Sequence, residues 1–185
     1  MRQFLYSFIV IIIMMVGCSS EEEHLYSSEG RDPIISETEA GDFIIRLQSS
    51  KGIYKEDESV KIVAKLKYVG EEDSITIFYG ESPFLYDITE TELGIHATNI
   101  HQRLENPTNE QLLDRGEWLE KEFNKTFLSA SDEEYLESFE WFLDGEGFPA
   151  GNYEIELRTD FLTLNVDDDE FQQHNYSTNI MLKSE

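Results

Sequence analysis

The sequence is poor in cysteine and in basic residues, and each shortage excludes a class of protein. A single cysteine in 185 residues leaves no partner for an intramolecular disulfide, a redox pair or a zinc site built on several thiolates. Lysine and arginine number 14 against 39 acidic residues, so the formal net charge is −25. The phosphates of nucleic acids and anionic membrane surfaces repel a chain this acidic, and we therefore expect neither as a direct partner.

The common catalytic motifs are absent as well. The sequence has no Gly-x-Ser-x-Gly nucleophile elbow, no His-Glu-x-x-His metal-binding helix and no glycine-rich phosphate loop. A catalytic histidine needs a nucleophile and an orienting group within hydrogen-bond reach. No motif supplies these groups for the histidines, which are His24, His96, His101 and His174. We therefore expect no enzymatic activity, no catalytic residue and no cofactor apart from a covalent lipid.

The amino-terminal segment is typical of an export signal. Arg2 gives a short positive start, and the apolar stretch from Phe4 to Val16 is 13 residues long. This length fits the apolar region of a signal peptide better than a membrane-spanning helix, which needs about 20 residues. The following segment, Met15–Cys18, resembles the lipobox of bacterial lipoproteins, in which apolar residues and a small residue precede a cysteine.

The lipobox resemblance implies that Cys18 is lipidated. Diacylglycerol would alkylate its thiol, residues 1–17 would be removed as a signal peptide, and Cys18 would become the first residue. Two acyl chains hold a protein stably at a membrane, whereas one chain binds only marginally. We therefore expect a protein anchored to the cell membrane at its extracytoplasmic face. The alternatives are an uncleaved amino-terminal anchor and an ordinary signal peptide with a chance cysteine.

Residues 18–40 are expected to form the lipidated cysteine and an acidic, disordered tether. Between Ser19 and Ala40 there are seven acidic residues and one base, without sustained apolar periodicity. Repulsion between the acidic residues should extend the segment. As an alternative, Ile34 and Ile35 could open a first strand.

Residues 41–185 show the period-two alternation that is typical of half-buried strands. The clearest example runs from Val60 to Tyr68, where one face is apolar and the other carries three lysines. The comparable segments are Phe43–Leu47, Ile75–Tyr79, Phe84–Ile88, Gly94–Ile100, Tyr153–Phe161 and Tyr176–Leu182. We predict one mainly-β domain, an antiparallel β-sandwich in which one face of each sheet is buried.

One helix is expected within this domain, over residues 131–143. Ser131 and Glu134 form a capping box at its start. Phe139 and Phe142 fall on one apolar face, as the packing of a surface helix requires.

Residues 112–127 fit two structures. Their apolar residues allow a helix, but Leu119, Lys121 and Phe123 also alternate as they would in a strand. The preceding Leu-Asp-Arg-Gly-Glu is typical of a turn that enters a strand, so we favour the strand and keep the helix as the alternative.

Two short segments resemble known families. Pro149–Ile155 is similar to a corner of immunoglobulin-like domains in secreted bacterial proteins, in which a glycine makes the turn and a tyrosine fills the core. Gly80–Tyr86 resembles a segment of small lipoproteins of bacilli and of the BsuPI-type proteinase-inhibitor fold. These resemblances imply an immunoglobulin-like β-sandwich over about residues 41–182.

The leading functional hypothesis is a non-enzymatic binding or interaction module at the cell envelope. The strong negative charge favours a basic protein partner through electrostatic steering. The resemblance implies, as a first alternative, an extracellular proteinase inhibitor of BsuPI-like type. The turn Glu81–Pro83 and the loop 104–111 are candidates for the segment that such an inhibitor presents to a protease.

A second alternative is a Ca²⁺-dependent envelope module. Ca²⁺ takes about six to eight oxygen ligands, and the acidic run that could supply some of them is Asp167, Asp168, Asp169 and Glu170. The run lacks EF-hand spacing, and a solvated turn is the simpler interpretation. Trp118 and Trp141 also lie among acidic residues, where an exposed tryptophan could anchor a cationic or sugar partner or could instead pack on the sheet.

Overall fold

The computed structural model describes residues 30, 32–56, 58–99, 107–125, 128–130, 140, 142–143, 147–165 and 170–185. Nearly all of the regular structure within these ranges is β-strand. The strands are β1 Ile34–Ala40, β2 Phe43–Ser49, β3 Ile53–Tyr54, β4 Ile62–Tyr68, β5 Ser74–Tyr79, β6 Phe84–Glu90, β7 His96–Asn99, β8 Asn109–Asp114, β9 Trp118–Glu122, β10 Leu128–Ala130, β11 Gly151–Thr159, β12 Phe161–Asn165, β13 Glu170–His174 and β14 Ser177–Ser184.

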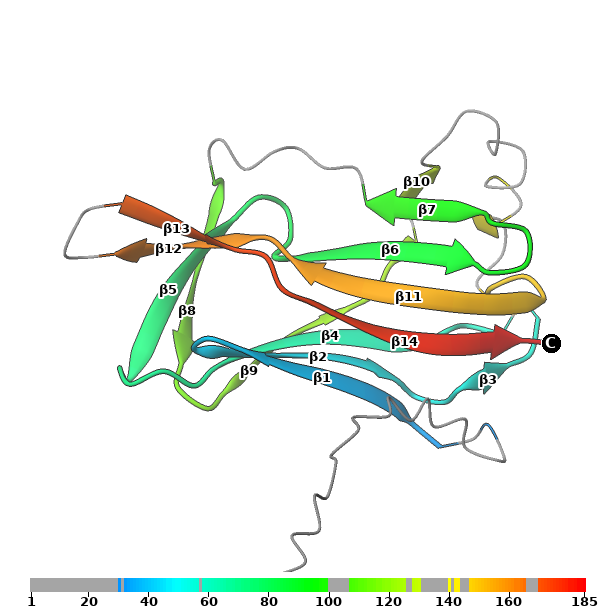
Figure 1. Cartoon of the computed structure of the whole chain (residues 1–185), viewed down its shortest axis with the longest axis horizontal. Helices are drawn as coiled ribbons and strands as arrows, with labels where there is room; N and C mark the ends of the chain where they lie inside the picture. The colour runs from blue at the N-terminus through cyan, green and yellow to red at the C-terminus, as the bar shows by residue number, and fades with distance from the viewer. Residues whose placement is uncertain are drawn as a thin grey trace, which may run out of the picture.

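The described strands form three sheets (Figure 1). Sheet A has the strand order β1-β2-β4-β9, sheet B has β10-β7-β6-β11-β14-β3, and sheet C has β13-β12-β5-β8. Neighbouring strands are antiparallel except β14 and β3, which are parallel. Sheets A and B face each other across one core, so the predicted antiparallel β-sandwich is confirmed.

The core forms because the period-two pattern turns one apolar face of each sheet inward. Alternate residues of β2 and β4 are buried, and alternate residues of β6, β11 and β14 meet them from the other sheet. Fully burying one large apolar side chain stabilises the fold by about 1.5–3 kcal/mol. The largest fully buried side chains are Tyr54, Tyr153, Phe43, Phe84, Phe148, Phe161, Ile45, Leu47, Ile62, Leu66, Ile77 and Ile88.

Sheet C is formed by the continuations of two antiparallel strand pairs. Each of these two-stranded ribbons begins in sheet A or sheet B and continues into sheet C. In the first ribbon, β11 and β12 pair with β14 and β13, and the register stays the same from Arg158↔Ser177 to Phe161↔His174. In the second, β4 and β5 pair with β9 and β8. The far halves of the two ribbons then pair with each other through β12 and β5, which closes one end of the sandwich (Figure 1).

The predicted corner at Pro149–Ile155 has the geometry that its sequence suggests. Tyr153 lies near the start of β11, is buried, and donates its hydroxyl hydrogen to the carbonyl oxygen of Pro149 at 2.8 Å. The backbone N–H of Asn152 donates to the buried carboxylate of Glu90 at 3.2 Å. A tyrosine that bonds to the backbone a few residues upstream is a recurring feature of immunoglobulin-like sandwiches.

The predicted tether boundary at residue 40 is wrong. Ile34–Ala40 forms β1, which pairs along the whole of β2 from Ile34↔Ser49 to Ala40↔Phe43. The folded structure extends to Gly30, whose carbonyl oxygen accepts hydrogen bonds from the N–H groups of Gly52 and Ile53. The acidic residues of this segment alternate with half-buried ones, so they lie on the exposed face of an edge strand. The alternative strand opening at Ile34 is therefore confirmed.

The strand interpretation of residues 112–127 is confirmed for residues 112–114 and 118–122, whereas residues 123–125 continue no strand and residues 126–127 lie outside the described ranges. Asn109–Asp114 is β8 and Trp118–Glu122 is β9, with a turn at Arg115 and Gly116 between them. Gly116 has a φ of 86°, a left-handed conformation that glycine adopts without steric cost.

Most of the expected helix over 131–143 lies outside the described residues. Its described members, Glu140, Phe142 and Leu143, have helical backbone, and Phe142 is buried in the core.

Candidate functional site

The outer face of sheet C carries apolar side chains that the sandwich core does not cover. In the central strands β5 and β12, Ile77 and Phe161 point into the core and are fully buried. Because successive side chains alternate across a strand, Phe78 and Leu162 point the opposite way. The same alternation places side chains of β8, β12 and β13 beside them. We call these five residues the outer apolar face: Phe78, Leu112, Leu162, Leu164 and Phe171.

Three members of the outer apolar face are exposed, whereas Phe78 is half-buried and Leu162 is buried. Relative exposure is 56% for Leu112, 54% for Phe171 and 39% for Leu164. The rings of Phe78 and Phe171 meet edge to face, with centroids 5.4 Å apart, so the exposed phenylalanine has a fixed neighbour. Contiguous exposed apolar groups on a soluble domain mark interaction sites more often than isolated ones do.

Acidic residues border the outer apolar face. Glu110 pairs across the sheet with Phe78, and Asp114 lies two residues beyond Leu112 on the same strand. Asp160 precedes β12 and accepts a hydrogen bond from Gln173 Nε2 at 3.0 Å. The four strands of sheet C contain no lysine or arginine. An apolar centre with charged residues at its edge is the usual arrangement of a protein interface.

The outer face of sheet A places Trp118 among cations of its own chain. The guanidinium carbon of Arg46 lies 4.5 Å from the ring centroid, and Lys67 Nζ lies 4.3 Å from it. Arg46 also forms an ion pair with Glu37 on β1. The half-buried Trp118 therefore has intramolecular partners. This agrees with the alternative that the tryptophan packs on the sheet. Trp141 lies outside the described residues.

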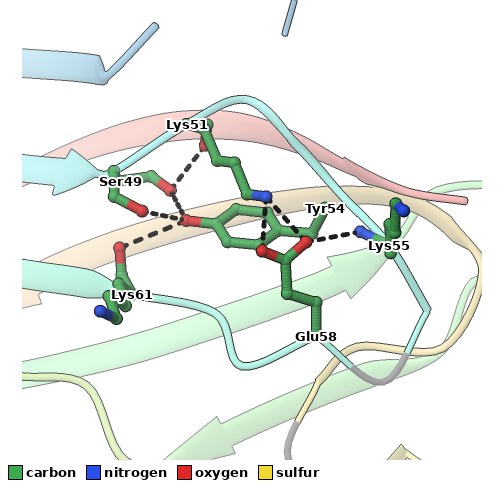
Figure 2. Close-up of polar contacts among 7 residues, drawn as sticks. Ser49, Lys51, Tyr54, Lys55, Glu58 and Lys61 are labelled. Carbon is green, nitrogen blue, oxygen red and sulfur yellow. Dashed lines mark hydrogen bonds and ion pairs between the residues drawn. The ribbon is translucent and has the colours of Figure 1, made fainter. Parts of the chain in front are cut away.

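Hydrogen bonds and an ion pair connect residues of the segment between β2 and β4, as Figure 2 shows. The Tyr54 hydroxyl lies 2.8 Å from Ser49 Oγ, and Lys51 Nζ contacts both carboxylate oxygens of Glu58 at 2.6 and 2.7 Å. The hydrogen bond from Lys51, with a further one from the backbone N–H of Lys55, lowers the pKa of Glu58. Ser49 is fully buried and donates its hydroxyl hydrogen to the carbonyl oxygen of Lys51, so this serine is not placed to attack a substrate.

The two described histidines also have intramolecular partners. His174 is buried, with Nε2 2.8 Å from Thr163 Oγ1 and Nδ1 2.9 Å from the Tyr176 hydroxyl. Burial lowers its pKa, which a neighbouring aspartate partly offsets. His96 Nε2 lies 3.7 Å from an oxygen of Asp87. His24 and His101 lie outside the described residues.

The predicted lipid and metal sites fall almost wholly outside the described residues. Cys18, Asp167, Asp168 and Asp169 are not described, whereas Glu170 opens β13 and is exposed. Within the described ranges, no group of three or more histidine, cysteine, aspartate or glutamate residues is placed to hold a metal ion. The helical residues of those ranges include no helix of the length and apolar character that a membrane crossing requires.

Where they are described, the segments expected of an inhibitor are anchored at single residues and otherwise largely exposed. In the turn Glu81–Pro83, Pro83 is buried and its carbonyl oxygen accepts a hydrogen bond from the N–H of Asp160 at 3.0 Å. The Oγ of Ser82 accepts a bond from the N–H of Phe84 at 3.1 Å. Within the loop 104–111, residues 109–111 belong to β8 and residues 104–106 lie outside the described ranges.

Comparison with known proteins gives no family assignment. The chain matches no family model, and no curated protein matches it.

Proposed function

We propose that this protein is a lipid-anchored extracytoplasmic lipoprotein whose β-sandwich is a non-enzymatic module that binds another protein. The outer apolar face of sheet C is the observation that carries the binding role, because three of its side chains are largely exposed on one sheet face. The anchor rests on the sequence around Cys18, which combines an apolar stretch of signal-peptide length with a lipobox-like ending.

The arrangement of the strands suits a module held at one end. The first residues of β1 lie beside β3 and the end of β14, because Gly30 bonds to Ile53 and Lys183 pairs with Ile53. Sheet C lies at the opposite end of the long axis (Figure 1). A lipid on Cys18 would thus hold the end that contains β1 and β3 nearer the membrane and present sheet C away from it.

The anchor is tested by comparing the full-length protein with its Cys18→Ala variant in the native host. We expect wild-type protein in the membrane fraction, with a diacylglycerol-bearing Cys18 as its first residue in mass spectrometry. The variant should be released or should accumulate as an unprocessed precursor. A processed, membrane-bound Cys18→Ala protein would contradict the anchor.

The binding role is tested by chemical crosslinking of the full-length protein in native membranes, followed by recovery under denaturing conditions. We expect one protein to be enriched over a mock sample, and its yield to fall in a Leu112→Asn, Phe171→Asn double variant. The matched control is an Ile35→Asn, Leu93→Asn variant, which changes two exposed apolar residues outside sheet C. Recovery of no specific partner from any of these samples would contradict the proposed function.

A further inference from the structure

We propose that the outer apolar face of sheet C is the docking site for a basic segment of another protein, with apolar side chains that cover the sheet and lysine or arginine side chains at its border. This inference rests on the proposed function, and it adds the surface and the chemistry of the partner. It follows from the exposure, the border charges and the position of the outer apolar face.

The exposed side chains span the width of the sheet. Phe171 lies on the edge strand β13, Leu164 on the adjacent strand β12, and Leu112 on the opposite edge strand β8. With strands about 4.8 Å apart, three spacings separate the two edges by about 14 Å. An occupant that covers all three side chains must therefore lie across the sheet and bring several apolar groups of its own.

Exposed apolar residues elsewhere in the described ranges do not form such a face. Leu93 is 64% exposed in the turn that follows β6, Ile35 is 52% exposed on the edge strand β1, and Val69 is 42% exposed directly after β4. They belong to different elements, and single exposed apolar side chains are normal on protein surfaces. Sheet C differs because three such residues share one face, with Phe78 packed edge to face against one of them.

The charges around the outer apolar face select a basic occupant. Glu110, Asp114 and Asp160 border it, and no strand of sheet C contributes a lysine or arginine. The nearest base along the chain, Arg115, is engaged with the Glu71 carbonyl oxygen at 3.0 Å and with Asp73 at 3.5 Å. A lysine or arginine in the partner would meet the carboxylates of Glu110, Asp114 and Asp160 at this border, where charge complementarity gives specificity and faster association.

The same charges disfavour a second copy of this chain as the occupant. Two copies joined through sheet C would bring their acidic borders together, and each chain carries a formal net charge of −25. Like-charge juxtaposition across an interface costs several kcal/mol, which is how surfaces reject wrong partners.

The test is selection of binders from a displayed library of random twelve-residue peptides on the full-length protein. Two variants probe the surface: Leu112→Asn with Phe171→Asn removes apolar groups, and Glu110→Gln with Asp114→Asn removes border charges. The matched controls are Ile35→Asn with Leu93→Asn, and Glu39→Gln with Glu122→Gln, which change exposed residues outside sheet C. All of these side chains are exposed, so we expect the charge variants and the Ile35, Leu93 control to unfold within about 0.5 kcal/mol of wild type. The Leu112→Asn, Phe171→Asn variant also loses the ring contact with Phe78, so we expect it to be less stable by about 0.5–1.5 kcal/mol and to remain folded.

We expect the enriched peptides to combine apolar residues with lysine or arginine. Their dissociation constants should rise at least about tenfold in both sheet C variants, the equivalent of about 1.4 kcal/mol, and should stay unchanged in both controls. Enrichment of acidic or uncharged peptides, unchanged binding to the sheet C variants, or no enrichment would overturn the inference. Self-association that the sheet C variants abolish would overturn it in favour of a second copy.

The outcomes separate this inference from the proposed function. A partner recovered from membranes with undiminished yield in the Leu112→Asn, Phe171→Asn variant leaves the binding role standing and removes sheet C as its site. Failure to recover any partner removes the proposed function itself.

Discussion

At the scale of single residues, His174 packs against the core where the first ribbon passes from sheet B to sheet C. Its ring stacks on Phe161 with centroids 5.0 Å apart, and both ring nitrogens have hydroxyl partners. Burial lowers the pKa of this histidine, which is partly offset by Asp42. The surroundings of His174 therefore favour the neutral imidazole over the charged one.

The His174 environment predicts a loss of stability in acid. As the pH falls below about 6.5, the unfolded chain takes up a proton that folded His174 does not accept, so the free energy of unfolding decreases until the lower folded-state pKa is passed. Urea unfolding at pH 7.5 and pH 5.5 should show this decrease, and the decrease should be smaller in His174→Gln. The control is His96→Gln, which changes the half-buried histidine on β7. An equal pH dependence in His174→Gln and wild type would refute the role.

Tyr153 makes a second prediction at this scale. The Tyr153→Phe change keeps the ring and removes the only hydroxyl that bonds to the buried Pro149 carbonyl oxygen in the described residues. An unpaired buried acceptor costs about 1–3 kcal/mol. We expect the free energy of unfolding to fall by that amount in denaturant titration, and a change under 0.3 kcal/mol would show that the hydrogen bond is not needed.

At the scale of elements, the period-two alternation of apolar residues predicted the strands that have one buried face. It did not predict the edge strand β1, whose exposed face is acidic. Phe43–Leu47, Val60–Tyr68 and Tyr176–Leu182 alternate cleanly, and their inner faces are buried as expected. The Ile34–Ala40 strand was hidden by its acidic residues, which resemble those of a disordered tether. An edge strand such as β1 can form with one half-buried face and one exposed face. Its amino-acid composition therefore does not distinguish it from a disordered segment.

The outer apolar face could not be located from the sequence. Adjacent apolar pairs such as Ile77-Phe78, Leu112-Leu113 and Phe161-Leu162 signal strands with apolar groups on both sides. They do not tell which strands become neighbours, because sheet C joins segments that are more than eighty residues apart in sequence, as the Leu162↔Phe78 pair shows. The outer apolar face therefore forms only because the two ribbons pair with each other.

Strand β1 gives a prediction at the scale of elements. A chain that begins at Gly30 retains β1, whereas one that begins at Asp42 loses it and exposes the outer edge of β2. We expect the shorter chain to be less stable by about 1–2 kcal/mol, because it loses the half-buried Ile34, which contributes part of the stabilisation that a fully buried side chain of its size would give. Thermal or urea unfolding of both chains measures the difference, and equal stability would mean that β1 adds nothing to the fold.

At the scale of the whole molecule, charge and anchoring act together on the proposed binding. A net charge of −25 raises the rate at which a basic partner arrives, and the effect weakens as salt screens it. The proposed lipid at Cys18 would hold the end with β3 near the membrane and leave sheet C free to meet partners. The unequal roles of the two ends follow from strand order rather than from any single residue.

Salt dependence is the prediction that belongs to this scale. The association rate of a basic, apolar peptide with the full-length protein should fall at least about tenfold between low and high salt, because electrostatic steering is screened. The dissociation rate should change less, since apolar contacts on sheet C would limit release. Stopped-flow fluorescence measures both rates, and an association rate independent of salt would contradict steering.

Site-specific photocrosslinking in living cells tests the central claim most directly. A photoreactive amino acid would replace Leu112 on sheet C in one full-length protein and Leu93, which is slightly more exposed, in another. We predict a covalent adduct with one basic extracytoplasmic protein from position 112 and none from position 93. Adducts of equal yield from both positions, or none from position 112, would contradict the account of a lipid-anchored module that binds through sheet C.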